Sequence, residues 1–172
     1  MKLLQPDVVL GGNVFCLTPA LISHYGLKGL VLDIDDTIVP IKTTEVSEQL
    51  MAWLAAMRQE CKIWLVTNNP QKQRISTIAQ SLDLPYIMSA AKPSVRKLRQ
   101  AVDDMDLPYS QVAMVGDRVF TDVLGGNRLG LLTILAQPIS ATASTSSFHL
   151  LRRIEFGLAK LSGVSLIATN LP

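Results

Sequence analysis

The residues that could carry chemistry are acids, a hydroxyl and an ammonium group that follow successive apolar runs of the chain. Asp33 lies near the end of the run "GLVLDI", Asp35 directly follows the run, and Thr37 completes the pattern D-x-D-x-T. Carboxylates this close repel one another unless a cation, hydrogen-bond donors or a reaction stabilises them. Later runs lead into Thr67 in "LVTNN", Lys92 in "AKPS", and Asp117 with Asp122 in "GDRVFTD". These residue types suit cation binding and acid–base or nucleophilic catalysis.

Five short apolar runs alternate with segments of helical spacing, and this alternation must position the polar residues. The runs are "GLVLDI" (29–34), "CKIWLVT" (61–67), "YIMSA" (86–90), "QVAMVG" (111–116) and "LLTILA" (131–136). Each is continuous rather than alternating, as expected for strands that are covered on both faces. Segments with helical spacing lie between them, at 44–59, 71–82, 94–105 and 120–129. The sequence therefore predicts an α/β protein with a doubly wound, mostly parallel sheet.

The carboxyl ends of parallel strands meet at one edge of a sheet, and the ligand crevice of an open α/β sheet lies beyond that edge. Four consecutive strands would therefore present acid, hydroxyl, ammonium and acid around one crevice. A cation and a substrate placed there would stabilise the acids. Asp36 is interpreted as a turn or capping residue, and Thr37 as a residue whose hydroxyl bonds to the loop backbone.

The order of these motifs resembles that of the haloacid dehalogenase (HAD) superfamily of phosphatases. Its four motifs match at Asp33/Asp35, Thr67, Lys92 and Asp117/Asp122, and the resemblance runs from about residue 18 to 136. Within the superfamily, "LTPALISHYGLKGLVLDIDDT", "VTNN", "AKP" and "GDRVFTDVLGGNRLG" resemble the YqeG-type group of subclass IIIA. That group includes phosphatidylglycerophosphate phosphatases of fungi and plants.

The resemblance implies a phosphomonoesterase with Mg²⁺ as its cofactor and an HAD-like Rossmannoid fold. Asp33 would attack phosphorus and form an aspartyl phosphate. Asp35, kept protonated by its acidic neighbours, would act first as general acid and then as general base. Asp33, Asp117 and the backbone carbonyl of Asp35 would hold the metal ion. The other implied site residues are Thr67, Asn68 and Lys92 for the phosphoryl group, with Asp122 and Thr37 in support.

Two other interpretations of the motifs stay open from the residues alone. A response-regulator receiver also gathers acids, a threonine and a lysine around Mg²⁺, but its phosphorylated acid precedes the threonine on a later strand. A catalytically silent HAD-like binding module is the second, although every motif position here holds a competent residue. The glycines of "LGGNRLG" follow a helical pattern, which favours close packing or a helix end over a nucleotide-binding loop.

The spacing of the motifs leaves no room for the cap domain that HAD enzymes commonly insert. From Thr37 to Thr67 there is space for a short flap, "IVPIKT", one helix and one strand, and from Thr67 to Lys92 for one helix and one strand. An open site suits a phospholipid head group, and the resemblance favours phosphatidylglycerophosphate. Arg118 and Lys72 are the candidates for its second phosphate. A phosphosugar, a phosphoprotein or a nucleic-acid end would also fit.

The length of 172 residues fits one domain over 1–172. Residues 1–28 form a lead-in, with Thr18 as a helix N-cap before Pro19. Residues 138–147 are predicted to be a linker. Residues 148–161 are predicted to form an amphipathic helix that docks on the core or lies on a membrane surface.

Charge and composition restrict the partners and the compartment. The net charge of +2 comes with no long run of Lys and Arg, so no nucleic-acid partner is expected. No stretch approaches the ~18 apolar residues of a membrane span. Cys16 and Cys61 lack metal-ligand spacing and are interpreted as reduced thiols. These observations predict a cytoplasmic protein and leave a peripheral membrane contact open.

Overall fold

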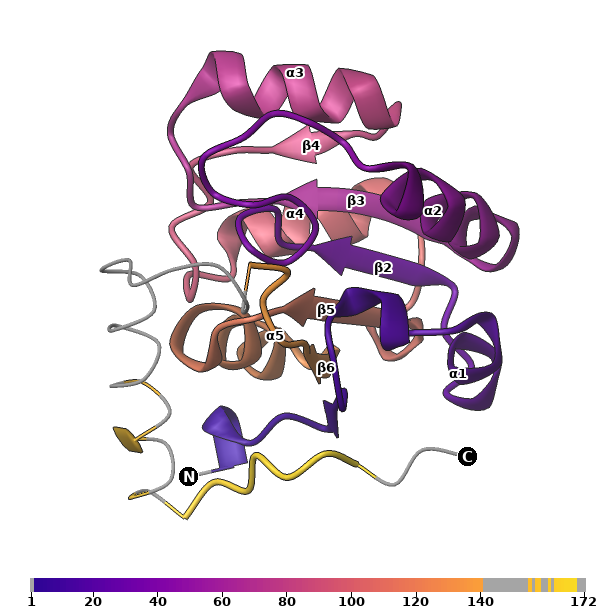
Figure 1. The fold of residues 1–172 in the computed structure, drawn as a ribbon. Helices are drawn as coiled ribbons and strands as arrows, with labels where there is room; N and C mark the ends of the chain where they lie inside the picture. The colour runs from indigo at the N-terminus through magenta and orange to yellow at the C-terminus, as the bar shows by residue number, and fades with distance from the viewer. Residues whose placement is uncertain (1, 141–154, 156, 159–160, 162, 170–172) are drawn as a thin grey trace.

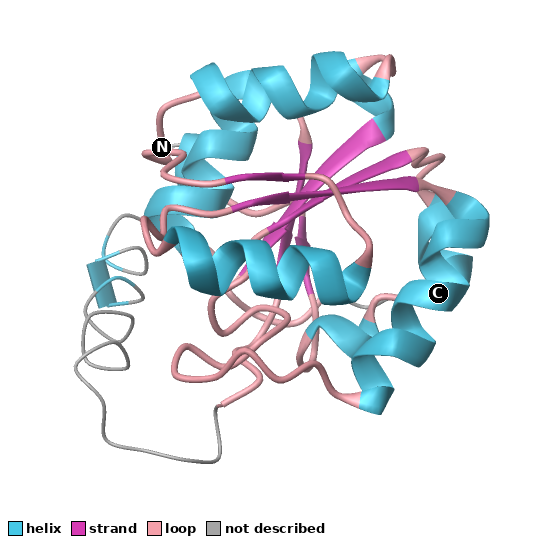
Figure 2. Ribbon diagram, turned by 90° about the horizontal axis from the view of Figure 1, so that it is seen from above, coloured by secondary structure: helices cyan, strands magenta, loops and turns pink. Residues whose placement is uncertain are grey.

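The computed structural model describes residues 2–140, 155, 157–158, 161 and 163–169. In this part of the chain six parallel strands form one sheet in the order β1-β6-β5-β2-β3-β4. The strands are β1 Val8–Val9, β2 Gly29–Leu32, β3 Lys62–Val66, β4 Tyr86–Ile87, β5 Val112–Gly116 and β6 Leu132–Leu135. Helices cover both faces of the sheet (Figures 1 and 2). The predicted doubly wound α/β fold is confirmed.

Each predicted helical segment contains a helix. The α-helices are α1 Pro19–His24, α2 Glu48–Glu60, α3 Lys72–Leu82, α4 Arg96–Met105 and α5 Leu124–Leu129. Short 3₁₀ turns lie at Lys2–Leu4, Val14–Cys16 and Tyr109–Gln111, and a π-helical turn, η4, spans Val119–Val123. Thr18 caps α1 as predicted, because its hydroxyl accepts a hydrogen bond from the Leu21 N–H at 3.3 Å.

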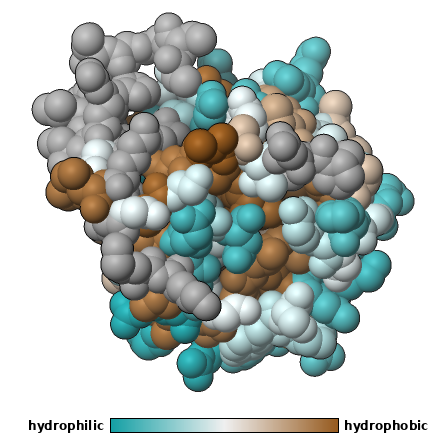
Figure 3. Space-filling view, turned by 90° about the horizontal axis from the view of Figure 1, so that it is seen from below, coloured by the Kyte–Doolittle hydropathy of each residue, from teal (hydrophilic) through white to brown (hydrophobic). Residues whose placement is uncertain are grey.

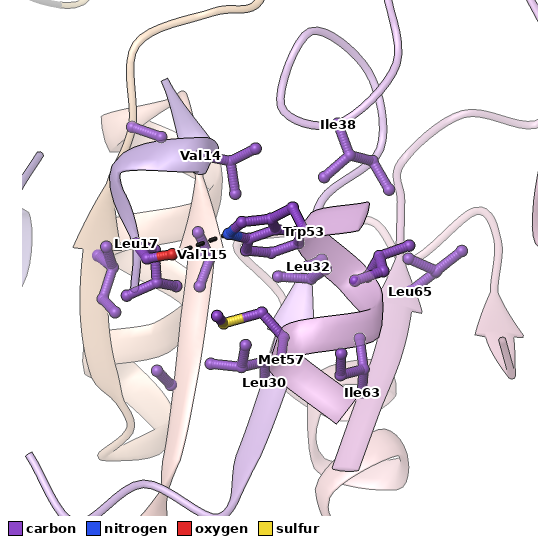
Figure 4. Packing of buried hydrophobic residues seen from close by; sticks show 14 of the residues in the cluster. Val14, Leu17, Leu30, Leu32, Ile38, Trp53, Met57, Ile63, Leu65 and Val115 are labelled. Carbon is purple, nitrogen blue, oxygen red and sulfur yellow. Dashed lines mark hydrogen bonds between the residues drawn. The ribbon is translucent and has the colours of Figure 1, made fainter. Parts of the chain in front are cut away.

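The side chains of β2 alternate between two buried clusters, one on each face of the sheet. Leu30 and Leu32 pack in the cluster that includes apolar residues of α1, α2 and α3, whereas Val31 packs with residues of α4 and α5. Figure 4 shows the first cluster, where Trp53 of α2 lies over the strands and donates its indole N–H to the Leu17 carbonyl at 2.8 Å. Burial on both faces explains why the strand sequences are continuously apolar.

Two features of the fold depend on short segments. Strand β1 lies inside the predicted lead-in and was not predicted, because two residues are too few to show a pattern. Helix α5 packs very close to the sheet, since a Cβ at Gly126 would lie 2.6 Å from Cγ2 of Thr133 and 2.9 Å from Cβ of Met114. Gly130, with φ of 79°, ends this helix in the left-handed conformation. The interpretation of these glycines as close packing and a helix end is confirmed.

The predicted linker 138–147 and helix 148–161 lie mostly outside the described residues. Four residues of the helix are described as helical, and two of them, Leu158 and Leu161, are 50% and 86% exposed. Seen from below, the surface shows apolar groups interspersed with polar ones (Figure 3). Among the described residues, no helix has the length and apolar character needed to cross a membrane.

Candidate active site

The loops that follow β2, β3, β4 and β5 surround a cavity of about 440 Å³. Seven of the predicted site residues line it: Asp33, Asp35, Thr67, Asn68, Lys92, Asp117 and Arg118. The position of Asp33 is fixed by the sheet, since its N–H donates to the Val115 carbonyl of β5 at 2.9 Å and so continues the ladder of β2. The parallel strands therefore bring together residues that are far apart in the sequence.

Lys92 lies between acids in the loop before α4. Its side chain is 1% exposed, and Nζ lies 2.6 Å from Asp33 Oδ1 and 2.7 Å from Asp122 Oδ1. The ammonium group also donates to the Val66 carbonyl at 2.8 Å. Burial by itself lowers the pKa of Lys92, but the attraction of Asp122 and Asp33 outweighs it and raises the pKa above its ordinary value. Lys92 is therefore a buried, fully charged lysine rather than a surface one.

The Asp33 carboxyl lies in an environment that disfavours its ionised form. Burial raises the pKa of Asp33 to about 7, with Lys92 acting to lower the value and Asp122 to raise it. One ammonium group thus does not fully offset the effect of burial and of the neighbouring acids on this carboxyl. A further cation close to Asp33 would favour the ionised carboxylate.

The acids form a cluster with the donor atoms of a metal site. Carboxylate oxygens of Asp33, Asp117 and Asp122 all lie within 4.8 Å of one another, and the three residues are buried. Such hard oxygen donors fit Mg²⁺. The hydroxyl of Thr37, fully buried, donates to Asp117 Oδ1 at 3.4 Å. Thr37 therefore contacts the acid cluster. The predicted hydrogen bond from this hydroxyl to the loop backbone is wrong, because the hydroxyl donates to Asp117 instead.

Asp122 reaches Lys92 from the turn η4, which leads into α5. Its Oδ1 faces Lys92, and its Oδ2 accepts the backbone N–H of Arg118 at 3.2 Å. A Cβ at Gly116 would overlap the Asp122 carboxylate, so the glycine at the end of β5 makes room for it. Sequence reasoning missed Gly116, although its place directly before Asp117 was a usable signal.

The contacts of Asp35 differ from expectation. Its Oδ1 lies 2.6 Å from Nη1 of Arg74, and its Oδ2 accepts the side-chain amide of Asn69 at 2.9 Å. The Asp35 carboxylate is therefore hydrogen-bonded to a cation and to an amide. The expectation that acidic neighbours surround Asp35 and keep it protonated does not agree with these contacts. Sequence reasoning missed Asn69 and Arg74. Asn69 stands in the "VTNN" motif, but nothing in the sequence distinguishes Arg74 from other basic residues of its helix.

The loop after β3 carries Thr67 and Asn68. The backbone N–H of Lys92 donates to Asn68 Oδ1 at 2.7 Å, and Asn68 Nδ2 donates to the Lys92 carbonyl at 3.0 Å. Asn68 thus joins two loops, and both polar atoms of its side chain have a backbone partner. The Thr67 hydroxyl accepts the N–H of Asn69 at 3.1 Å, which leaves its own proton available for a substrate oxygen.

The remaining predicted residues are divided between the cavity and the surface. Arg118 lines the cavity and forms an ion pair with Glu155. Lys72 is exposed on the first turn of α3 and does not line the cavity. Asp36 lies in a turn with φ of 59°, where its Oδ1 accepts the hydroxyl of Ser140 at 2.6 Å, in keeping with its interpretation as a turn residue.

Comparison with known proteins adds the family. Residues 89–138 match the HAD-hydrolase-like family. The "Probable phosphatase YqeG" of Bacillus subtilis (strain 168) is 33% identical over 131 residues, which cover 76% of each chain. The chain belongs to the HAD superfamily. As the motifs predicted, this HAD protein is a phosphatase, and between Thr37 and Lys92 its structure holds α2, β3, α3 and β4 with no cap domain.

Two further likenesses concern the substrate group and the fold. The chloroplastic phosphatidylglycerophosphate phosphatase 1 of Chlamydomonas reinhardtii is 30% identical over 76% of this HAD phosphatase, which spans 52% of the algal protein, about half its length. The magnesium-bound structure of YfnB from Bacillus subtilis has a TM-score of 0.51 at 12% identity, over 76% of this chain and 99% of that chain. The second likeness establishes the fold alone.

Proposed function

We propose that this HAD phosphatase is a Mg²⁺-dependent phosphomonoesterase with Asp33 as its nucleophile and phosphatidylglycerophosphate as its substrate. The observation that carries the chemical part is the buried cluster around Lys92. Its ammonium group lies 2.6 Å from Asp33 and 2.7 Å from Asp122, and the carboxylate oxygens of both acids and of Asp117 lie within 4.8 Å of one another. Such a cluster suits a dianionic substrate only if more positive charge is present.

The residues present fit Mg²⁺ because the cluster offers carboxylate oxygens and neither imidazole nor thiolate. Asp33 and Asp117 would hold the ion, with the backbone carbonyl of Asp35 as a further ligand. Asp122, engaged by Lys92 and by the Arg118 N–H, would orient Lys92 instead. Bound Mg²⁺ would supply the positive charge that lets a carboxylate approach a phosphate dianion.

The proposed reaction has two steps, in which Asp33 carries the phosphoryl group and Asp35 transfers the proton. An oxygen of Asp33 attacks phosphorus, the bond to the leaving oxygen breaks, and Asp35 gives its proton to that oxygen. Water then attacks the aspartyl phosphate and gives a proton to Asp35, so that inorganic phosphate leaves and Asp33 is restored. Lys92 and the Thr67 hydroxyl stabilise the charge on the transferring phosphoryl group in both steps.

The lipid part of the proposal is supported by the open cavity and by the likeness to the algal enzyme. A phosphate on a membrane surface can enter a site that has no cap domain, and the protein would then contact the membrane peripherally. Arg118 is the candidate for the second phosphate of the head group, since it lines the cavity, whereas Lys72 does not. The ion pair of Arg118 with Glu155 favours a second candidate, a soluble ester with one phosphate, because this cation already has an anionic partner.

The test compares kcat/KM, with Mg²⁺ present, on vesicles that contain phosphatidylglycerophosphate and on glycerol 3-phosphate, sugar phosphates and nucleotides. We expect a clear preference for the vesicles. A preference for a soluble ester would reject the lipid substrate and keep the phosphatase chemistry.

The nucleophile is tested in the same assay with Asp33→Asn, which removes the attacking charge and keeps the side-chain shape. We expect turnover to collapse while the far-UV circular dichroism spectrum is unchanged. Asp83→Asn is the matched control, since Asp83 is an exposed residue at the end of α3 with φ of 48°, a conformation that asparagine also tolerates. Near-wild-type turnover by Asp33→Asn would reject the mechanism.

A further inference from the structure

Arg74 of α3 lies beside the proposed general acid–base residue and uses each of its three guanidinium nitrogens. Nη1 donates to Asp35 Oδ1 at 2.6 Å, Nη2 to the Pro40 carbonyl at 3.0 Å, and Nε to the Thr43 carbonyl at 3.2 Å. The Arg74 side chain is only 10% exposed. A buried arginine whose nitrogens all have protein partners is not placed to bind a substrate phosphate.

Asp35 connects Arg74 with the cavity. Asp35 and Asn69 line the cavity, whereas Arg74 does not. Asp35 Oδ1 is held by the charged Arg74, and Oδ2 by the neutral amide of Asn69 at 2.9 Å. The ion pair with Arg74 holds Oδ1 more strongly than the neutral amide of Asn69 holds Oδ2, so Oδ2 is the oxygen that can exchange its partner for a substrate atom.

The two carbonyls that Arg74 binds belong to the flap that follows β2. Ile41, between them, lines the cavity. In an enzyme without a cap domain this flap is part of the wall of the site, and an unfastened loop would have to be ordered each time a substrate binds. The planar fork of arginine can serve three acceptors at fixed angles, which a lysine ammonium at the same place cannot do.

We propose that Arg74 is a positioning residue for the phosphatase reaction, and this rests on the proposed role of Asp35. It holds Asp35 by Oδ1, so that Oδ2 faces the leaving oxygen, and it fastens the flap at Pro40 and Thr43 to the same carboxylate. The loss of Arg74 should therefore slow the step in which Asp35 acts as an acid.

The test measures the first-step rate by rapid quench in single turnovers, on glycerol 3-phosphate and on 4-nitrophenyl phosphate. An alkoxide needs protonation as it leaves, whereas nitrophenolate needs little. General acids contribute roughly 10²–10⁴-fold, so for Arg74→Met we expect a loss of roughly ten- to a hundredfold on the alkyl ester and of about threefold or less on the aryl ester. Arg74→Lys keeps a charge near Asp35, so its first-step rate on the alkyl ester should fall less than that of Arg74→Met. The loss should still be larger on the alkyl ester than on the aryl ester.

Arg58→Met is the matched control. Arg58 of α2 also holds two backbone carbonyls, those of Leu82 and Asp83 at the end of α3, but it has no carboxylate of the site as a partner, so both rates should stay unchanged. Equal losses on the two esters in a folded Arg74→Lys variant would overturn the positioning role, even if Arg74→Met fails to fold. Asp33→Asn is run alongside, because activity retained there would overturn the proposed mechanism itself, independently of Arg74.

Discussion

Replacing Lys92 with methionine would remove the ammonium group between Asp33 and Asp122 and keep most of the side-chain volume. Lys92 is 1% exposed, and its two ion-pair contacts are 2.6 and 2.7 Å long. Breaking a buried ion pair from one side costs about 3–5 kcal/mol, because a buried charge is left uncompensated. We expect a loss of this size in the free energy of unfolding without metal at alkaline pH, because the pKa of Asp33, already raised to about 7 with Lys92 present, is higher still once Lys92 is removed. At lower pH the loss should shrink, because Asp33 can then bind a proton.

The assay is urea unfolding followed by tryptophan fluorescence, with EDTA or with Mg²⁺. Trp53 reports on the fold because it is 9% exposed and packs in the core. A ligand that binds only the folded state stabilises it by about 2.7 kcal/mol at a hundred times its Kd. In Lys92→Met the acids lack their ammonium partner, so Mg²⁺ should bind more tightly and restore more stability than it adds to the wild type.

Lys97→Met is the control for this experiment. Lys97 is a half-buried lysine whose ammonium donates to the Met88 carbonyl at 2.7 Å and has no acid of the site as a partner. Its loss should cost about 1 kcal/mol, the usual net value of one hydrogen bond, with no response to Mg²⁺ beyond that of the wild type. The reasoning is refuted if Lys92→Met in EDTA unfolds at the wild-type urea concentration, or if Mg²⁺ stabilises both proteins equally.

Asp35→Asn should still bind Mg²⁺ and phosphate but lose kcat by roughly 10²–10⁴-fold, with a smaller first-step loss on an activated aryl ester. Equal first-step losses on activated and unactivated esters, measured by rapid quench, would count against Asp35 as the acid. Because burial raises the pKa of Asp33 from 3.8 to about 7, the metal-free folded protein holds a proton there that the unfolded chain has released. The contribution of Asp33 to stability therefore falls as the pH rises from 3.8 to about 7. Because Mg²⁺ displaces the proton, its affinity should rise by up to about tenfold for each pH unit in this range. Titration calorimetry in buffers of different ionisation enthalpy checks this, and a Mg²⁺ affinity that does not change below about pH 7 would contradict it.

Most of the fold could be predicted because burial leaves a local pattern. Strand β2 is buried on both faces, so four consecutive apolar residues identify it without any knowledge of its partners. Strand β1 has two residues and owes its structure to pairing with β6, which no local pattern records. The π-helical turn η4 lies within a segment that was predicted to be an ordinary helix, because its local spacing is also helical.

The sequence by itself determined which residues gather in the cavity. Asp33, Thr67, Lys92 and Asp117 each follow a strand, and parallel strands end at the same edge, so their order in the chain was enough. Only the tertiary structure decided what surrounds each of them. The three acceptors of Arg74 lie 31 to 39 residues earlier in the chain. Hydrogen bonds over that separation depend on how α3 and the flap pack together, and the spacing of residues along one element carries no record of that packing.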